Sequence, residues 1–215
     1  MKNIIEVYDK YKIMPNLREH MFRVAAVASL ICDNFNETLP KKEIVSACLL
    51  HDMGNIIKSD FKDFPEFLMP NGLDYWVKVK NEYIKKYGSE EHKATEIIAK
   101  ENSLPIKTIE IIKHIGFSNA MKNESEKLFE NKICNYADMR VGPYGVLSLE
   151  ERISEAHERY KGKNHSISSN DFNSLTNSLR NIEEQIFLKC QIKPEDITDE
   201  AITPIILELR NFVIE

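Results

Sequence analysis

Hydrophobic residues recur at three- and four-residue intervals along most of the chain, which is the spacing of an amphipathic helix. One clear run consists of Leu17, Met21, Val24, Ala28, Ile31 and Phe35. A second run, near the C-terminal end, consists of Phe172, Leu175, Leu179, Ile182 and Ile186. No alternating strand pattern is longer than a few residues. The sequence therefore predicts an all-α fold with helices over residues 3–12, 17–35, 40–53, 74–87, 89–102, 105–114, 127–140, 148–161, 172–186 and 203–213.

The helix boundaries follow from residues that favour helix starts and stops. Pro15 is expected to separate the first two helices, and Pro40 fits the first turn of the third, with Gly54 just past its end. The segment Ser148-Leu-Glu-Glu151 has the form of a capping box, which predicts a helix start. Residues 56–73 contain two prolines and an Asn-Gly pair, so they are expected to be irregular.

The chain is expected to divide near residue 162. Residues 162–170 are polar and predict a mobile linker. On this reading residues 1–162 form a helical core. Residues 163–215 form a C-terminal helical extension, whose narrow apolar stripe packs on the core or on a second subunit of a homodimer.

Composition narrows the possible functions. The 215 residues carry a formal net charge of -5 without a basic block, which makes a nucleic-acid partner unlikely. The longest apolar run, residues 24–32, is too short to span a membrane. The N-terminal segment has no signal-peptide core. The four cysteines lack CxxC spacing and are interpreted as reduced core thiols: Cys32, Cys48, Cys134 and Cys190. We therefore expect a cytoplasmic protein.

The stretch LLHDMGN places His51 and Asp52 at the end of an apolar run. A buried imidazole and carboxylate are costly unless they are hydrogen-bonded, paired or bound to a metal. Four further residues of these types lie at helix ends or on inward faces: His20, His92, His114 and Asp138. Together the six form a ligand set for one or two divalent ions such as Fe, Mn, Co, Ni or Zn. Singly, each also has an ordinary structural explanation, such as a core histidine or a helix-end charge.

The ordered set resembles the HD-domain superfamily of metal-dependent phosphohydrolases. That family has a His on the first core helix, an adjacent His-Asp pair on the second and a later Asp, matched here by His20, His51-Asp52 and Asp138 in the contexts LLHDMG and YADMR. The resemblance implies an HD-domain helical bundle, here with additional C-terminal helices. It implies that these four residues hold a first metal ion. Binuclear members add two histidines, in whose places His92 and His114 stand, with Asp52 bridging the two ions.

The same resemblance implies hydrolysis of a phosphate ester by a metal-bound hydroxide, with a small phosphorylated metabolite or a nucleotide as substrate. Asp52 and Glu91 are the candidate catalytic residues. The candidate phosphate-binding residues are Arg23, Arg140 and Lys58. Ordinary surface salt bridges are the alternative explanation for these arginines, and a solvated helix-start carboxylate is the alternative for Glu91. Several binuclear members carry a lysine three residues after the Asp of the pair, where this chain has Asn55.

Two other functions stay open on the sequence. Di-iron oxygenases on the same fold use the same ligand types and would require O2. A non-catalytic, metal-stabilised ligand-sensing module is the third possibility. The aromatic segment of residues 61–76 could form a pocket wall or lid, or could simply pack on the core.

Overall fold

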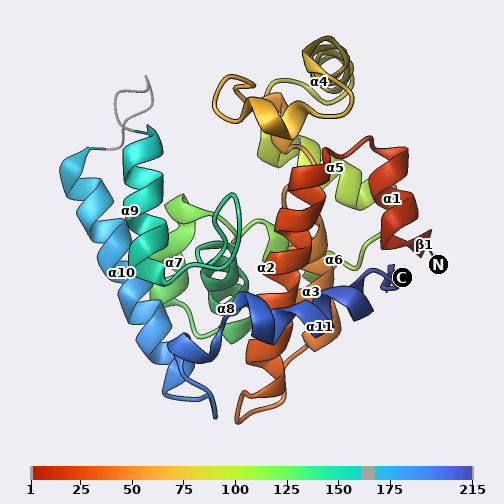
Figure 1. The fold of residues 1–215 in the computed structure, drawn as a ribbon. Helices are drawn as coiled ribbons and strands as arrows, with labels where there is room; N and C mark the ends of the chain where they lie inside the picture. Colours follow the sequence, from red (N-terminus) through yellow and green to blue (C-terminus); the bar gives the residue numbers. More distant parts are fainter. Residues whose placement is uncertain (1, 161–167, 215) are drawn as a thin grey trace.

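The structure is a computed structural model that describes residues 2–160 and 168–214 (Figure 1). The predicted all-α fold is confirmed. The α-helices are α1 Ile4–Lys10, α2 Pro15–Asp33, α3 Lys41–Leu50, α4 Leu73–Tyr87, α5 Glu91–Glu101, α6 Ile106–Ile112, α7 Ala120–Ser125, α8 Phe129–Asp138, α9 Leu149–Tyr160, α10 Ser169–Phe187 and α11 Asp199–Leu209. Short 3-10 helices are η1 Asn55–Ile57, η2 Pro65–Leu68, η3 Phe117–Asn119 and η4 Pro194–Asp196. No helix within these ranges is long and apolar enough to cross a membrane.

The antiparallel pair α2 and α3 forms the centre of the bundle, and α8 packs against both (Figure 1). Small, fully buried side chains such as Ala25, Ala28 and Ala47 lie on the two central helices. Small side chains let the axes of two helices approach closely, so α2 and α3 pack tightly against each other. Because α2 and α3 run in opposite directions, the first turns of α2 lie beside the end of α3. This arrangement places His20 next to the His51-Asp52 pair.

Several helix boundaries differ from those expected. Pro15 begins α2 instead of separating it from α1, since the missing N–H of proline costs nothing at the first helical position. Helix α6 ends at Ile112, so His114 follows the helix rather than occupying its last turn. Helix α11 begins at Asp199, where Thr198 caps it. The sequence pattern did not predict α7, the 3-10 helices or the short strands.

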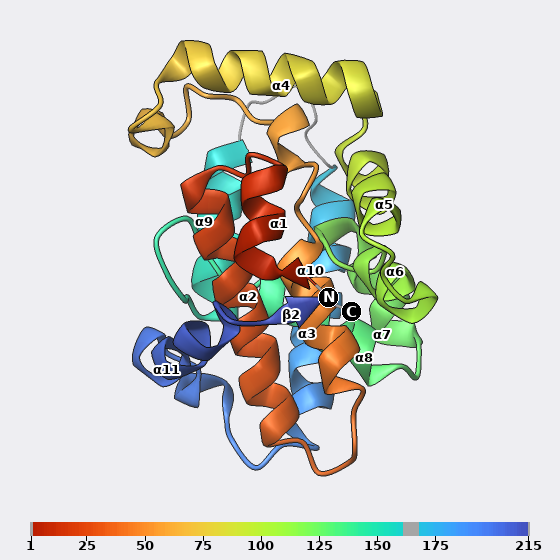
Figure 2. The same ribbon diagram turned by 90° about the vertical axis from the view of Figure 1, so that its right-hand side faces the viewer.

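The C-terminal helices pack on the body of the molecule. Helix α10 lies against α7 and α8, and α11 lies against α2. Strands β1 (Lys2–Asn3) and β2 (Val213–Ile214) pair antiparallel, which brings the two described ends of the chain together (Figure 2). The domain division near residue 162 and contact with a second subunit remain predictions. Most of the predicted linker of residues 162–170 lies outside the described residues, because the structure does not describe residues 161–167.

All four cysteines are free thiols. Cys48 and Cys134 are buried, while Cys32 and Cys190 are partly buried. Burial raises the pKa of Cys32 to about 12 and that of Cys190 to about 11. Burial also raises the pKa of Cys134 well above its ordinary value. Thiols with such pKa values hold their protons at neutral pH and are poor nucleophiles.

Candidate metal centre

Four side chains from three helices converge at one end of the central bundle. His20 lies in the second turn of α2, His51 and Asp52 follow α3, and Asp138 is the last residue of α8. His20 Nε2 lies 3.2 Å from Asp138 Oδ1 and 3.8 Å from Asp52 Oδ2. His51 Nε2 lies 3.5 Å from Asp138 Oδ1 and 3.7 Å from Asp52 Oδ2. Ligand atoms of His20, His51 and Asp52 all lie within 4.8 Å of one another, close enough to share one ion.

The imidazole of His51 fits a metal ligand on a structural ground that does not depend on the family. Its Nδ1 donates to the carbonyl oxygen of Cys48 at 2.8 Å, an assignment that follows from the carbonyl being an acceptor only. Its Nε2 is buried and has no hydrogen-bond partner among the described residues. A backbone carbonyl on one ring nitrogen and a free second nitrogen is the usual arrangement of a metal-ligating histidine. The donor set of two imidazoles and two carboxylates suits a divalent transition metal.

The charges of this cluster hold one another in their ionised forms. Burial lowers the pKa of His51, but the carboxylates of Asp52 and Asp138 and the Cys48 carbonyl outweigh burial and raise it to about 10. Burial raises the pKa of Asp138, but the nearby imidazoles of His20 and His51 outweigh burial and hold it well below its ordinary value. At neutral pH the metal-free cluster therefore carries a proton on His51. Metal binding must release that proton, so the apparent affinity for metal is expected to rise with pH.

The turn after the His-Asp pair is fixed by neighbours that the sequence pattern did not identify as site residues. Asn55 Nδ2 donates to Asp52 Oδ2 at 2.8 Å and so orients that carboxylate. Gly54 N donates to Thr95 Oγ1 at 2.9 Å. A Cβ at Gly54 would come within 2.2 Å of the Glu91 carbonyl oxygen, so only glycine lets α5 approach this closely. The position of Asn55, three residues after Asp52, could have identified it from the sequence as a site residue. The contact of Gly54 with α5 becomes visible only in the folded structure.

This contact brings the first turn of α5 beside the candidate metal centre. Glu91 Oε1 lies 3.4 Å from Lys58 Nζ and 3.6 Å from His92 Nε2. Burial raises the pKa of Glu91, but its own backbone N–H, Lys58 and His92 outweigh burial and lower it. Glu91 is therefore an ionised carboxylate at neutral pH, as a proton acceptor must be. His92 is 72% exposed and lies outside the group of mutually close ligand atoms.

His114 is also outside that group, but its surroundings are those of an oriented imidazole. Its Nδ1 lies 2.8 Å from Asn123 Oδ1, and Asn123 Nδ2 donates back to the His114 carbonyl oxygen. Its Nε2 faces Lys122 Nζ at 3.5 Å. The Asn123 contact leaves Nε2 as the nitrogen that would bind an ion. A second ion at His92 and His114 stays a prediction.

Metal content can decide between one ion and two. If His92 and His114 hold a second ion, His92→Ala and His114→Ala should each reduce the metal content from two ions per chain to one. The first ion stays because its ligands lie on α2, α3 and α8. Elemental analysis of the purified variants is the measurement. Wild-type metal content in both variants would mean that these histidines hold no ion.

The two arginines predicted to bind phosphate have different surroundings. Arg23 lies three residues after His20 on α2, which puts both side chains on one helix face. Among the described residues its guanidinium has no hydrogen bond or ion pair, although the residue is half-buried. Arg140 is only 3% exposed, and its guanidinium donates to Leu147 O, Tyr136 Oη, Pro194 O and Ile197 O. The prediction that Arg140 binds phosphate is therefore wrong, because its donors are used inside the fold.

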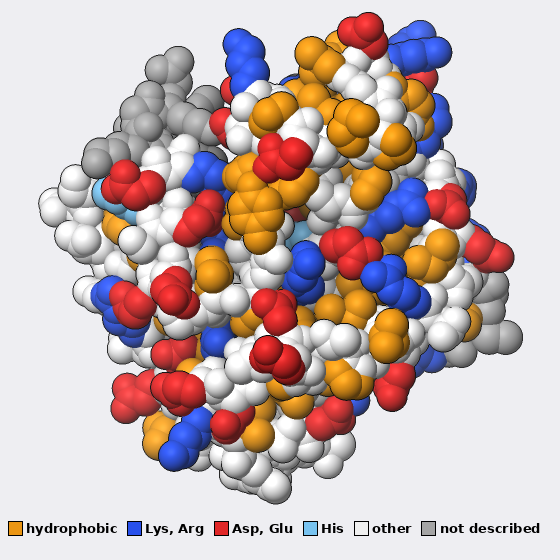
Figure 3. Space-filling view, in the orientation of Figure 1, with side chains coloured by type: hydrophobic (Ala, Val, Ile, Leu, Met, Phe, Trp, Pro, Cys, Tyr) orange, Lys and Arg blue, Asp and Glu red, His pale blue; other side chains and the backbone are white. Residues whose placement is uncertain are grey.

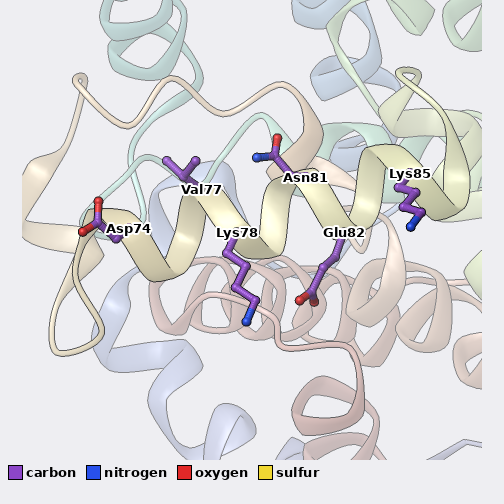
Figure 4. Close-up of a pocket in the computed structure, with 6 residues that line it drawn as sticks. All are labelled: Asp74, Val77, Lys78, Asn81, Glu82 and Lys85. Atoms are coloured by element: carbon purple, nitrogen blue, oxygen red, sulfur yellow. The ribbon is translucent and has the colours of Figure 1, made fainter.

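The candidate metal centre is accessible from one side. His20, Asp52 and Asp138 are each partly exposed. In Figure 3 a histidine is visible near the centre of the face, with hydrophobic, basic and acidic side chains around it. A separate surface depression of about 400 Å³ lies along α4, between Asp74 and Lys85 (Figure 4). Only α4 residues line it, and none is a candidate ligand, so it has no part in the chemistry of the metal centre.

Comparison with known proteins agrees with this geometry. A family model described as HD domain matches residues 17–140, which is more than half of the chain and includes all six candidate ligands. Searches of curated proteins and of solved structures found no significant match. The resemblance noted in the sequence is thereby confirmed. With the candidate ligands His20, His51 and Asp52 meeting at one point inside the matched region, the chain belongs to the HD domain family.

Proposed function

We propose that this protein is a metal-dependent phosphohydrolase that hydrolyses a phosphate ester of a small metabolite or nucleotide. HD domain proteins are generally metal-dependent phosphohydrolases. The observation that carries the proposal is the convergence of His20, His51, Asp52 and Asp138, with the buried Nε2 of His51 facing both carboxylates and lacking a hydrogen bond among the described residues. A bound divalent ion polarises a phosphoryl oxygen and makes water a stronger acid.

The protein side chains supply the remaining tasks. The planar guanidinium of Arg23 lies one helical turn from His20 and has no hydrogen bond or ion pair among the described residues, so it can bind two oxygens of a phosphate. Glu91 accepts a proton from the attacking water, because its low pKa keeps it ionised. Lys58 is half-exposed beside Glu91 and contributes a second positive charge at the rim. Asp52 is held in position by the amide of Asn55.

The proposal predicts phosphate release without an oxidant. Protein loaded with Mn, Co or Fe should release inorganic phosphate from a panel of nucleotides and sugar phosphates in strictly anaerobic buffer. Hydrolysis exchanges one P–O bond for another and involves no electron transfer. Phosphate release is measured against metal-free protein. Glu91→Gln should lower kcat about a hundredfold while keeping the metal, because it removes the proton acceptor.

Glu90→Gln is the matched control, since Glu90 is an exposed glutamate immediately before Glu91. Its kcat should equal that of the wild type. A fully metal-loaded protein that releases no phosphate but consumes O2 with an organic substrate would replace the proposal with an oxygenase. Metal-loaded protein that is inactive in both assays would favour a ligand-sensing module.

A further inference from the structure

Three aromatic rings from two separate loops contact one another on the surface. Phe64 and Phe67 stack with ring centroids 5.1 Å apart in and beside η2. The Tyr144 ring lies 5.6 Å from that of Phe67 and 6.1 Å from that of Phe64. Tyr144 Oη donates to Glu66 Oε1 at 2.7 Å, which fixes the phenol ring relative to η2. These three rings therefore hold one another in position and form one continuous aromatic surface. We call them the aromatic cluster.

The aromatic cluster is not core packing. Tyr144 is 67% exposed, and Phe64 and Phe67 are only half-buried. A cavity of about 330 Å³ opens between Phe64, the loop of residues 142–147 and helix α9. That volume lies at the lower end of the range for small-molecule sites, about 300–1,000 Å³. Exposed apolar surface next to a cavity is typical of a ligand-binding groove.

The polar groups on the cavity wall are already paired within the protein. Glu151 accepts hydrogen bonds from Ser148 at the start of α9. Glu155 accepts hydrogen bonds from Arg152 and Arg159. The guanidinium of Arg159 also lies 5.9 Å from the centre of the Phe64 ring. The two arginines offset the charge of Glu155, whereas Glu151 keeps its charge because the hydrogen bonds from Ser148 lower its pKa.

The wall of the groove follows the candidate metal centre closely along the chain. Gly142 on its wall is four residues after Asp138, so their Cα atoms can be no more than about 14 Å apart. Leu147 N donates to Arg140 O at 2.8 Å, and Val141 pairs with Val146, which fix this loop to the end of α8. Figure 3 shows hydrophobic side chains beside a histidine near the centre of the face in view. A small molecule long enough to span this separation would contact both the metal ligands and the groove.

We infer that the aromatic cluster binds a planar aromatic ring in the part of the substrate that the phosphate esterifies. The inference rests on the proposed phosphohydrolase function and specifies its substrate class. Offset or edge-to-face contacts with Phe64 and Tyr144 would hold the ring. Arg23 and the metal ligands would hold the phosphate at the other end. Substrates that carry a ring should therefore be preferred over those that end in a sugar or an aliphatic chain.

Adenosine monophosphate and ribose phosphate form a matched substrate pair, because they differ only in the base. With metal-loaded wild-type protein, the KM for adenosine monophosphate should be the lower of the two. Tyr144→Ala should raise that KM about tenfold and leave the KM for ribose phosphate unchanged, since loss of one stacking partner weakens ring binding by about that factor. Tyr144→Phe should retain most of the preference. Tyr75→Ala, an aromatic substitution on α4 outside the groove, is the control.

Calorimetric titration with adenosine provides a readout that does not require turnover. Binding that weakens about tenfold in Tyr144→Ala supports the groove even if neither phosphate ester is hydrolysed, an outcome that would count against the phosphohydrolase alone. Equal KM values for the two substrates, or adenosine binding that is absent or unchanged in Tyr144→Ala, would overturn the inference. Hydrolysis of both esters with no preference for the ring would support the phosphohydrolase function and would refute ring binding by the aromatic cluster.

Discussion

Replacing His51 or Asp52 by Ala is expected to remove the bound metal and to lower thermal stability. His51 Nε2 is buried and faces the carboxylates of Asp52 and Asp138, so a bound ion would join three groups that come from two different helices. A ligand present at about a thousand times its Kd stabilises a protein by about 4 kcal/mol. For a chain of this size that corresponds to a decrease in Tm of about 8–16 °C. Elemental analysis and calorimetry measure the two effects.

A chelator separates loss of metal from loss of packing. Removal of metal should lower the Tm of the wild type and should leave the Tm of His51→Ala unchanged. His157→Ala is the matched control, because His157 is half-exposed on α9 and contacts Phe172 instead of the candidate ligands. It should keep both the metal and the response to chelator. Undiminished metal in the His51 and Asp52 variants would refute the assignment of these ligands.

Replacing Arg23 by Ala is expected to lower kcat/KM about a hundredfold without loss of metal. Removal of one positioned donor to transition-state charge costs about 2.7–4 kcal/mol in other enzymes. Arg23→Lys should recover only part of the activity, because an ammonium group cannot make a bidentate contact. The inhibition constant of inorganic phosphate should rise in parallel. Steady-state kinetics and product inhibition are the measurements.

Arg180→Ala is the control for Arg23, since Arg180 pairs with Glu150 on the surface and should be kinetically silent. Arg140→Ala should behave differently from both. Four oxygen atoms lose their donor inside the fold, which is expected to destabilise the protein by about 3 kcal/mol or more. An Arg23 variant with wild-type kcat/KM, or one that loses its metal, would contradict the phosphate role.

The sequence predicted those parts of the candidate metal centre that depend on helix order. His20, His51, Asp52 and Asp138 were placed at helix ends or on inward faces, and three helices that pack together then bring such positions to one point. Hydrophobic spacing also predicted most helices, because the core covers a continuous face of each. Pro15 was misinterpreted, since proline both interrupts a helix and begins one, and the sequence alone does not distinguish the two.

The incorrect predictions concern the direction in which a side chain points and contacts between residues that are far apart in the sequence. Arg140 is only two residues from Asp138, but α8 ends between them, so its side chain turns toward carbonyls of residues 194 and 197. Hydrophobic spacing cannot reveal partners more than fifty residues away. Helix α7 was missed because its six residues show too little periodicity. Gly54 resembled an ordinary helix stop, whereas its main role is the close approach of α5.

The hydrogen bonds of Arg140 have a consequence for biosynthesis. All six candidate ligands are translated by residue 138, yet the end of α8 depends on the carbonyl oxygens of Pro194 and Ile197. Helix α11, which packs on the helix that carries His20, is translated later still. A chain growing on the ribosome therefore has every candidate ligand well before it has the contacts that hold them in place. We expect metal acquisition to be a late event, completed after the C-terminal helices have emerged.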